Sequence, residues 1–180
     1  MKLVLKILSL GIIFLFLCTV QLSAQKCKFK YEKKDPITGE VTKGTKFVVE
    51  AQWMITSKPF HRFIGISRIG DTYFIEIEIM VAGNAREFIS IGDPFVVKLA
   101  NDETITAYSQ AEFRPTQQAN QNLIYSTYIA KYEIDELSLQ KMAKSPPTFY
   151  RLNIEAKTYD KNLSGPVQKQ LSQAAKCILQ

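Results

Sequence analysis

Two cysteines near the ends of the chain place the strongest restriction on how it can fold. Cys27 and Cys177 enclose nearly all of the sequence after the N-terminal apolar segment, and the third cysteine, Cys18, lies inside that segment. In an oxidising compartment we expect the pair to form a disulfide, with Cα atoms roughly 5.5 Å apart. The first strand and the last helix must then lie side by side. A free catalytic thiolate is the alternative, but the single histidine, His61, is far away in the sequence.

The N-terminal segment predicts that the chain is exported. Two lysines supply a basic start, an apolar stretch follows, and small residues close the segment at Ser23 and Ala24. This is the order of a cleavable secretory signal peptide. We expect cleavage after Ala24, so that residues 1–24 are the signal peptide and residues 25–180 form a single globular domain in the periplasm or outside the cell.

Two other interpretations of this segment fit the residues less well. A membrane-spanning helix needs roughly 20 apolar residues, whereas this apolar core is shorter and is followed at once by Gln21. A lipoprotein signal places its cysteine after a small residue at the end of the core, whereas Cys18 follows Phe16 and Leu17 within it. No later segment approaches spanning length, so we expect no transmembrane span in the mature chain.

The mature chain is mildly basic. All 17 Asp and Glu residues lie after residue 24, together with all but two of the 23 Lys and Arg residues. A small positive charge permits attraction to anionic surfaces or polymers without requiring it, and we expect no nucleic-acid partner. The length suits one domain with its own core and is too short for two.

Alternating apolar and polar residues predict a mainly β fold of the α+β class. The segments with strand patterns are 26–31, 47–55, 72–81, 95–99, 104–108, 123–131 and 149–157. Asp135 can cap a short helix and Pro166 can open a C-terminal helix, while the polar stretch 114–122 predicts a loop. Because strands and helices do not alternate, we expect an antiparallel β-sandwich or curled sheet of about seven strands with a short helix and a C-terminal helix.

The usual catalytic patterns are incomplete. A nucleophile elbow needs a glycine two residues after its serine, but after Ser67 the glycine comes one residue too late, at Gly70. Glu76 and Glu78 have a spacing that suits the paired acids of a glycoside hydrolase, but their alternation with isoleucines is better explained as a solvent-facing strand surface. One histidine and two bonded cysteines cannot supply the usual zinc ligands. We therefore expect no metal or cofactor and assign no catalytic residue.

Aromatic and cationic side chains are interleaved between two predicted strands, at Phe60, His61, Arg62, Phe63 and Arg68. Such a combination can hold an anionic or carbohydrate ligand by stacking and charge, and loops carry binding residues more often than strands do. We predict that these five residues form a ligand-binding surface. Alternatively, the two phenylalanines pack beneath the loop as part of the core.

Several features together resemble small exported proteins of unassigned function from Gram-negative bacteria. They are the signal ending in Ser23-Ala24-Gln25, the early Cys27, the turn from Asp35 to Gly39, and the run from Tyr132 to Leu137 ahead of Pro146. The resemblance implies a periplasmic or secreted setting. It implies no activity and no catalytic residues.

The sequence therefore favours a non-catalytic exported binding or interaction module of unknown ligand. Its partner would be an anionic or carbohydrate ligand or another protein of the envelope. One alternative is a carboxylate-dependent hydrolase of the envelope or secreted space, which needs a pocket where two acids, or an acid and His61, converge. The other is a structural or assembly protein that offers a strand edge to a partner.

Overall fold

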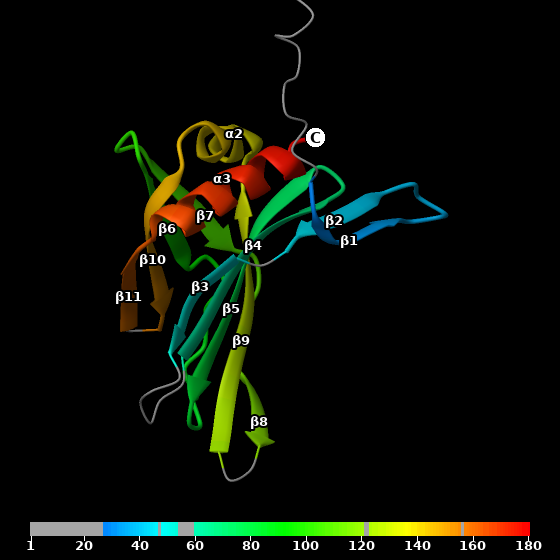
Figure 1. The fold of residues 1–180 in the computed structure, drawn as a ribbon. Helices are drawn as coiled ribbons and strands as arrows, with labels where there is room; N and C mark the ends of the chain where they lie inside the picture. Colours follow the sequence, from blue (N-terminus) through cyan, green and yellow to red (C-terminus); the bar gives the residue numbers. More distant parts are fainter. Residues whose placement is uncertain (1–26, 47, 54–59, 121–122, 156) are drawn as a thin grey trace, which may run out of the picture.

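The computed structural model describes residues 27–46, 48–53, 60–120, 123–155 and 157–180 (Figure 1). Its strands are β1 (Phe29–Lys34), β2 (Val41–Thr45), β3 (Val48–Trp53), β4 (Phe60–Ile69), β5 (Thr72–Ala82), β6 (Pro94–Leu99), β7 (Thr104–Ser109), β8 (Thr116–Asn120), β9 (Leu123–Ile134), β10 (Pro147–Ile154) and β11 (Lys157–Asn162). Its helices are α2 (Glu136–Lys144) and α3 (Gly165–Ile178). The predicted signal peptide, residues 1–24, lies outside the described residues.

The strands belong to one antiparallel sheet that is not closed. Its order is β1-β2-β4-β5-β9-β7-β6-β10-β11, with β3 added beside β4 and β8 added beside β9. The strands β4, β5 and β9 pair along most of their length and form the long spine of the molecule (Figure 1). β2 and β3 share the remaining edge of β4, one at each end of it.

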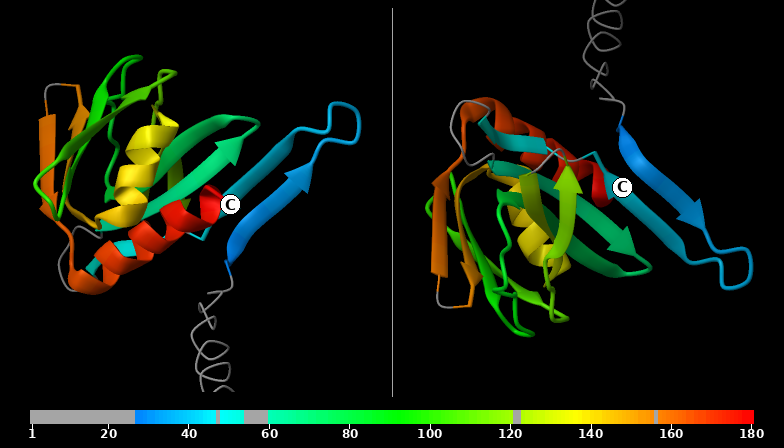
Figure 2. Two further views of the ribbon diagram at one scale, coloured as in Figure 1. Left: turned by 90° about the horizontal axis from the view of Figure 1, so that it is seen from above. Right: turned by 90° about the horizontal axis from the view of Figure 1, so that it is seen from below.

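Strand β5 shows how the sequence divides the two faces of the sheet. Its buried apolar residues recur at every second position, which is the period of a strand: Tyr73, Ile75, Ile77 and Ile79. They belong to the same hydrophobic core as the buried residues of both helices. The alternation predicted for 72–81 is therefore confirmed, and the core lies on the face of the sheet that the helices cover (Figure 2).

The helix α2 begins where the sequence predicted it. The Asp135 carboxylate accepts a hydrogen bond of 2.8 Å from the backbone N–H of Ser138, which satisfies one of the unpaired donors of the first turn. Leu139 and Met142 then point into the core and are at most 2% exposed. Together the cap and the apolar face fix the helix against the sheet.

The helix α3 is amphipathic and opens with Pro166 in its first turn, as predicted. Its buried stripe includes Val167, Leu171, Ala174 and Ile178, which recur at helical spacing. α3 packs against α2 and also contacts β2, β3, β4 and β10. The helix α3 thus packs against strands from both halves of the sheet.

The sheet curls, so that strands far apart in its order face each other. β4 and β10 are separated by β5, β9, β7 and β6, yet the Arg62 guanidinium on β4 donates a hydrogen bond of 3.0 Å to the Tyr150 hydroxyl on β10. The two further views show the same curvature around the helices (Figure 2). Of the two predicted arrangements, the described strands form the curled sheet and do not divide into two separate sheets.

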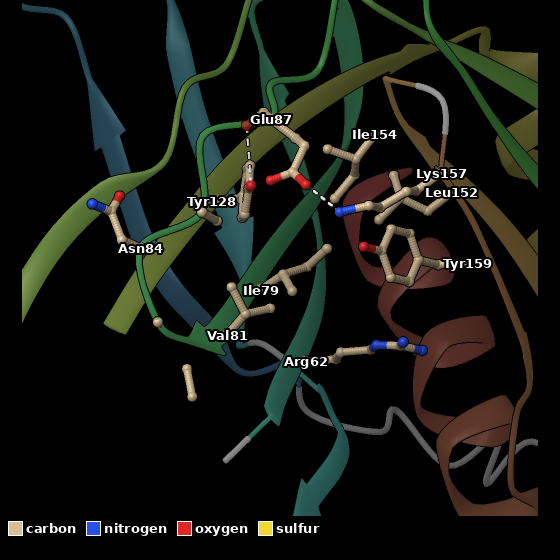
Figure 3. A pocket seen from close by; sticks show the side chains of 13 residues that line it. Arg62, Ile79, Val81, Asn84, Glu87, Tyr128, Leu152, Ile154, Lys157 and Tyr159 are labelled. Carbon is tan, nitrogen blue, oxygen red and sulfur yellow. Dashed lines mark hydrogen bonds and ion pairs between the residues drawn. The ribbon is translucent and has the colours of Figure 1, made fainter. Parts of the chain in front are cut away.

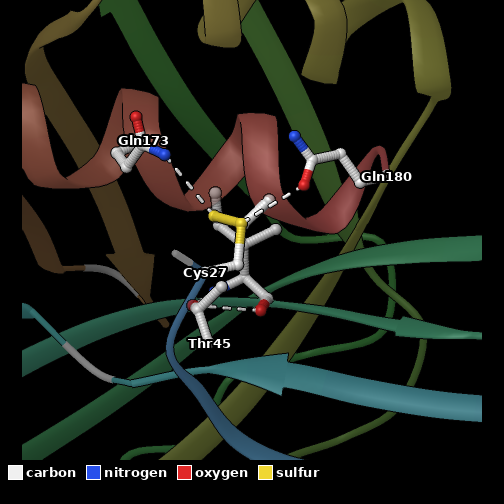
Figure 4. The surroundings of a disulfide bond; sticks show 6 residues. Cys27, Thr45, Gln173 and Gln180 are labelled. Carbon is white, nitrogen blue, oxygen red and sulfur yellow. Dashed lines mark hydrogen bonds between the residues drawn. A yellow bond between two sulfur atoms is a disulfide. The ribbon is translucent and has the colours of Figure 1, made fainter. Parts of the chain in front are cut away.

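A disulfide joins Cys27, just before β1, to Cys177 near the end of α3 (Figure 4). The two Cα atoms are 5.5 Å apart, the separation that the sequence predicted. The first strand and the last helix are therefore covalently held together, and this part of the prediction is confirmed.

The secondary structure differs from the sequence predictions at four points. The described residues form eleven strands in the sheet, more than predicted. Residues 60–69 form β4 instead of starting with a loop, and residues 116–120, inside a predicted loop, form β8. The strand β11 was not predicted. β8 and β11 carry many polar residues, and each exists because its backbone pairs with a longer neighbour, β9 or β10.

The outer face of β5 also differs from the solvent-facing surface that was predicted. Glu76 is only 7% exposed. Its Oε1 atom accepts hydrogen bonds from the hydroxyls of Ser67 (2.8 Å) and Tyr31 (3.1 Å), and it lies 2.9 Å from Nζ of Lys131. Glu78, two residues further on, is half-buried. The prediction fails because Tyr31, from the β1–β2 hairpin, reaches over this face.

The contact between Tyr31 and Gly44 explains why β2 carries a glycine. The two residues are opposite each other in the β1–β2 pair, and a Cβ atom added to Gly44 would lie 2.5 Å from Cζ of the Tyr31 ring. Gly44→Ala is therefore expected to lower the free energy of unfolding by about 1–3 kcal/mol, measured by chemical denaturation. In a Tyr31→Ala background the same change should cost much less, because the ring is gone.

Gly165→Ala is the matched control for this prediction. No heavy atom lies within 4 Å of a Cβ added at Gly165, so its substitution should leave stability nearly unchanged. An equal loss at Gly165, or losses for Gly44 and Tyr31 that simply add, would contradict the contact.

Candidate functional site

A cavity of about 480 Å³ lies where the curled sheet brings β10 and β11 opposite β4, β5 and β9 (Figure 3). We call it the β10–β11 cavity. The connection that follows β5, from Gly83 to Glu87, closes one side of it. The residues that line the cavity come from strands in both halves of the sheet. The cavity therefore forms only because the sheet curls and brings these strands together.

One part of the β10–β11 cavity wall is apolar, and polar side chains line the rest. Ile79 on β5 and Leu152 and Ile154 on β10 are each at most 4% exposed and line the cavity beside Val81. They occupy alternating positions on the core face of their strands. The cavity is therefore adjacent to the hydrophobic core and is bordered by side chains that belong to it. Such walls favour the apolar part of a ligand.

Two tyrosines add aromatic surface to the cavity. Tyr128 on β9 is buried, and its hydroxyl donates a hydrogen bond of 3.0 Å to the backbone carbonyl of Glu87. Burial, followed by the negative charge of Glu87, raises the pKa of Tyr128 to about 12. Tyr159 lies on β11, on the β10–β11 side of the cavity (Figure 3). Both rings provide stacking surface, and Tyr128 stays protonated at neutral pH.

Charged groups lie at two places around the cavity. Glu87 and Lys157 form an ion pair that joins the connection after β5 to β11. The hydrogen bond from Lys157, with those from backbone N–H groups, lowers the pKa of Glu87 to about 2, and the same pairing raises the pKa of Lys157. Arg62 brings a permanent positive charge from β4 and contacts Tyr150 both through its hydrogen bond and over the ring face.

The five residues predicted as a binding surface lie along one strand and are not gathered at one place. Arg62 lines the β10–β11 cavity, while Phe63 is half-buried and faces the other side of β4 by alternation. The side chains of Phe60 and His61 lie outside what the structure describes. Arg68 is six residues beyond Arg62, which is roughly 20 Å along a strand.

Arg68 makes its own local contacts at the far end of β4. It forms an ion pair of 3.0 Å with Asp71 and lies over the ring of Tyr73, 5.4 Å from the ring centroid. These contacts hold the turn between β4 and β5. Of the predicted residues, Arg62 is the one with a described side chain that lines the cavity.

Sequence reasoning missed Glu87, Tyr128, Lys157 and Tyr159. Tyr128 is an ordinary member of an alternating strand. Lys157 was predicted to end the strand 149–157 but begins β11, and Tyr159 also belongs to β11, which was not predicted. Only the pairing of β10 with β11, and the curl that turns this hairpin toward β5, bring them together. Arg62, by contrast, was predicted from the sequence because it is a cation that lies between aromatic residues.

The acids considered for catalysis do not meet in a described cavity. Glu76 is enclosed by its network on the outer face of β5, and neither Glu76 nor Glu78 lines the β10–β11 cavity. Among the described residues, no three His, Cys, Asp or Glu side chains gather closely enough to hold a metal ion. No helix in the same part of the chain has the length and apolar character that crossing a membrane requires.

The chain was compared with protein-family models, with curated proteins and with solved structures. No family model, curated protein or solved structure matches it. The resemblance to small exported proteins of Gram-negative bacteria therefore stays a prediction, and the case for a function depends on the site itself.

Proposed function

We propose that the protein is a non-catalytic exported binding module that holds a small amphipathic anion in the β10–β11 cavity. The observation that carries this proposal is the position of Arg62, a permanent cation at the edge of a cavity that is lined in part by buried aliphatic side chains. The disulfide supports a site of action outside the cytosol, since disulfides persist in oxidising compartments.

The chemistry of the lining determines the class of ligand. Ile79, Leu152 and Ile154 would contact an apolar or aromatic body, with the two tyrosine rings available for stacking. The guanidinium of Arg62 would contact a carboxylate, sulfate or phosphate group. Glu87 and Lys157 pair with each other, and the guanidinium of Arg62 is the group that would donate hydrogen bonds to an anionic ligand.

The protonation states in the cavity support binding over catalysis. A general base works best when its pKa lies near the ambient pH. The Glu87 carboxylate, with a pKa of about 2, is too weak a base, and Tyr128, with a pKa of about 12, is too weak an acid. The hydroxyl of Tyr128 is also engaged with a backbone carbonyl. A hydrolase that uses carboxylates is correspondingly less well supported.

A matched pair of fluorescent probes tests this proposal. Anilinonaphthalene sulfonate and N-phenylnaphthylamine share one aromatic body, and only the first carries a negative charge. Both are expected to bind the folded protein, and Arg62→Gln should weaken binding of the sulfonate about tenfold while leaving the neutral amine nearly unchanged. Val81→Trp, which fills the cavity, should abolish binding of both. Fluorescence titration measures each dissociation constant.

Two substitutions elsewhere in the sheet serve as controls. Arg151→Gln removes a cation from β10 that pairs with Asp160 at 2.7 Å and does not line the cavity. Val96→Trp places the same bulky side chain on a half-buried position of β6. Neither should change the affinity of either probe. Equal sulfonate affinities for Arg62→Gln and Arg151→Gln, or undiminished binding to Val81→Trp, would rule out the proposed site.

A further inference from the structure

A second and larger hollow lies beside the disulfide, along α3. Its volume is about 930 Å³, and it is lined by residues 27–28 before β1, the β2–β3 connection, the end of α2 with the connection that follows it, and residues of α3. We call it the lysine groove. The disulfide between Cys27 and Cys177 forms part of its surface (Figure 4).

Among the described residues that line the groove, none is Asp or Glu and five are lysines: Lys28, Lys46, Lys144, Lys169 and Lys176. All five are exposed. They come from four separate segments, so the cluster is produced by the fold and is not a basic run in the sequence. Lysine ammonium groups are charged at neutral pH, and the groove therefore carries a concentrated positive potential.

These lysines are not neutralised by neighbours that the structure describes. The ion pairs of the described residues engage other lysines, such as Lys98, Lys131 and Lys141, and none of the five. The side-chain oxygen of Gln180 lies close to the groove, 3.4 Å from Sγ of Cys27, and carries no charge. The described residues of the groove therefore keep an excess of positive charge.

The disulfide helps to assemble this cluster. Lys28 and Lys176 are the direct sequence neighbours of the two bonded cysteines, whose Cα atoms are only 5.5 Å apart. The bond therefore holds two like charges near each other despite their repulsion. Gln173 lies beside the bond and donates a weak hydrogen bond to Sγ of Cys177 (Figure 4). A cluster of like charges kept together at a covalent link is suited to a ligand that neutralises it.

We infer that the lysine groove binds a soluble oligoanion, a compact chain or ring that carries several phosphate or sulfate groups. A single anion would engage only part of the five ammonium groups. An anionic membrane would suit cations on a flat or protruding face, whereas these lysines surround a hollow. Lysine acts as a point charge without a fixed hydrogen-bonding geometry, so the groove selects for the number and spacing of negative charges. This site is independent of the β10–β11 cavity.

Tripolyphosphate is the probe for this inference, with orthophosphate as its single-group counterpart. Isothermal titration of the mature, disulfide-bonded protein should show tripolyphosphate binding at least about tenfold more tightly than orthophosphate, and binding should weaken as salt is added. The Lys169→Gln/Lys176→Gln double variant should weaken tripolyphosphate binding about tenfold. Glutamine is nearly as good a helix former as lysine, so α3 should stay folded, which circular dichroism would check.

The matched control is Lys33→Gln/Lys34→Gln, which removes the same amount of charge from exposed positions of β1 outside the groove. It should change tripolyphosphate affinity less than about twofold. Equal losses in the two double variants would mean that binding follows net charge and would overturn the inference. It would also be overturned if tripolyphosphate bound no better than orthophosphate, or if the protein bound phosphatidylglycerol vesicles but not tripolyphosphate.

Discussion

Replacing Cys27 and Cys177 together with serine is expected to lower the free energy of unfolding by about 3–5 kcal/mol. The bond links residues 150 positions apart, so its loss releases almost the whole described chain in the unfolded state. A longer closed loop loses more conformational entropy in the unfolded ensemble, and the expected effect is correspondingly large. Equilibrium denaturation in urea, monitored by the fluorescence of Trp53, would measure it.

The folded structure should survive this substitution, because α3 is also held by apolar contacts. Its buried stripe belongs to the main core, and Ser172 donates a hydrogen bond of 2.9 Å to the backbone carbonyl of Ala143. The parent protein under reducing conditions should match the double variant, which controls for the effect of serine itself. A loss below about 1 kcal/mol would mean that the bond contributes little to stability, contrary to the loop-closure argument.

The second large effect is expected at Glu76, the buried carboxylate on the outer face of β5. Burial by itself raises the pKa of Glu76, but the hydrogen bonds from Lys131 and Ser67 and the charge of Lys131 outweigh burial, and the net pKa is lowered from 4.5. Glu76→Gln removes the charge that these donors face. We expect a loss of about 2–3 kcal/mol in the free energy of unfolding at neutral pH.

The lowered pKa of Glu76 also predicts how the stability should change with pH. Because the pKa of Glu76 is lower in the folded than in the unfolded protein, the ionised carboxylate stabilises the fold above about pH 4.5. This contribution is lost as the pH falls through the lowered value. The stability difference between the parent and Glu76→Gln should therefore shrink as the pH falls below about 4.5, as measured by denaturation at several pH values.

Glu78→Gln is the matched control for the Glu76 prediction. It lies on the same strand and the same face, two residues away, and takes no part in the network of Tyr31, Ser67 and Lys131. Its substitution should have a small effect on stability. Equal losses for the two variants, or a Glu76→Gln difference that is unchanged in acid, would show that the network does not stabilise the fold through the charge of Glu76.

Local chemistry was sufficient to predict several elements of the fold. The capping side chain of Asp135 and the alternation from Tyr73 onward depend on neighbouring residues only, and both are confirmed. The pairing of Cys27 with Cys177 was predictable because no other cysteine follows the apolar segment. The cap and the alternation can be recognised from a short stretch of sequence, and the cysteine pair from the number of cysteines.

Features that depend on long-range pairing could not be predicted in the same way. Residues 116–120 and 157–162 show no strong apolar alternation, and they form strands because β9 and β10 offer edges to pair with. The alternation around Glu76 indicates which face it occupies but not that Tyr31, 45 residues away, covers that face. The β10–β11 cavity and the lysine groove are also products of topology.

The two candidate binding sites differ in the physical interaction on which each depends. The β10–β11 cavity combines buried aliphatic side chains with one ion pair and the guanidinium of Arg62, so we expect burial of apolar surface to supply a large part of the affinity. In the part of the chain that the structure describes, the lysine groove is lined by five exposed cations and by no Asp or Glu. Added salt should therefore weaken binding to the groove strongly and binding to the cavity only slightly.

The most direct test of the proposed function is a crystal structure of the protein with bound anilinonaphthalene sulfonate. We predict that the aromatic body lies between Ile79, Leu152 and Ile154, with the sulfonate within hydrogen-bonding distance of the Arg62 guanidinium. An empty β10–β11 cavity in a crystal where the probe is bound elsewhere, for example in the lysine groove, would contradict the central claim.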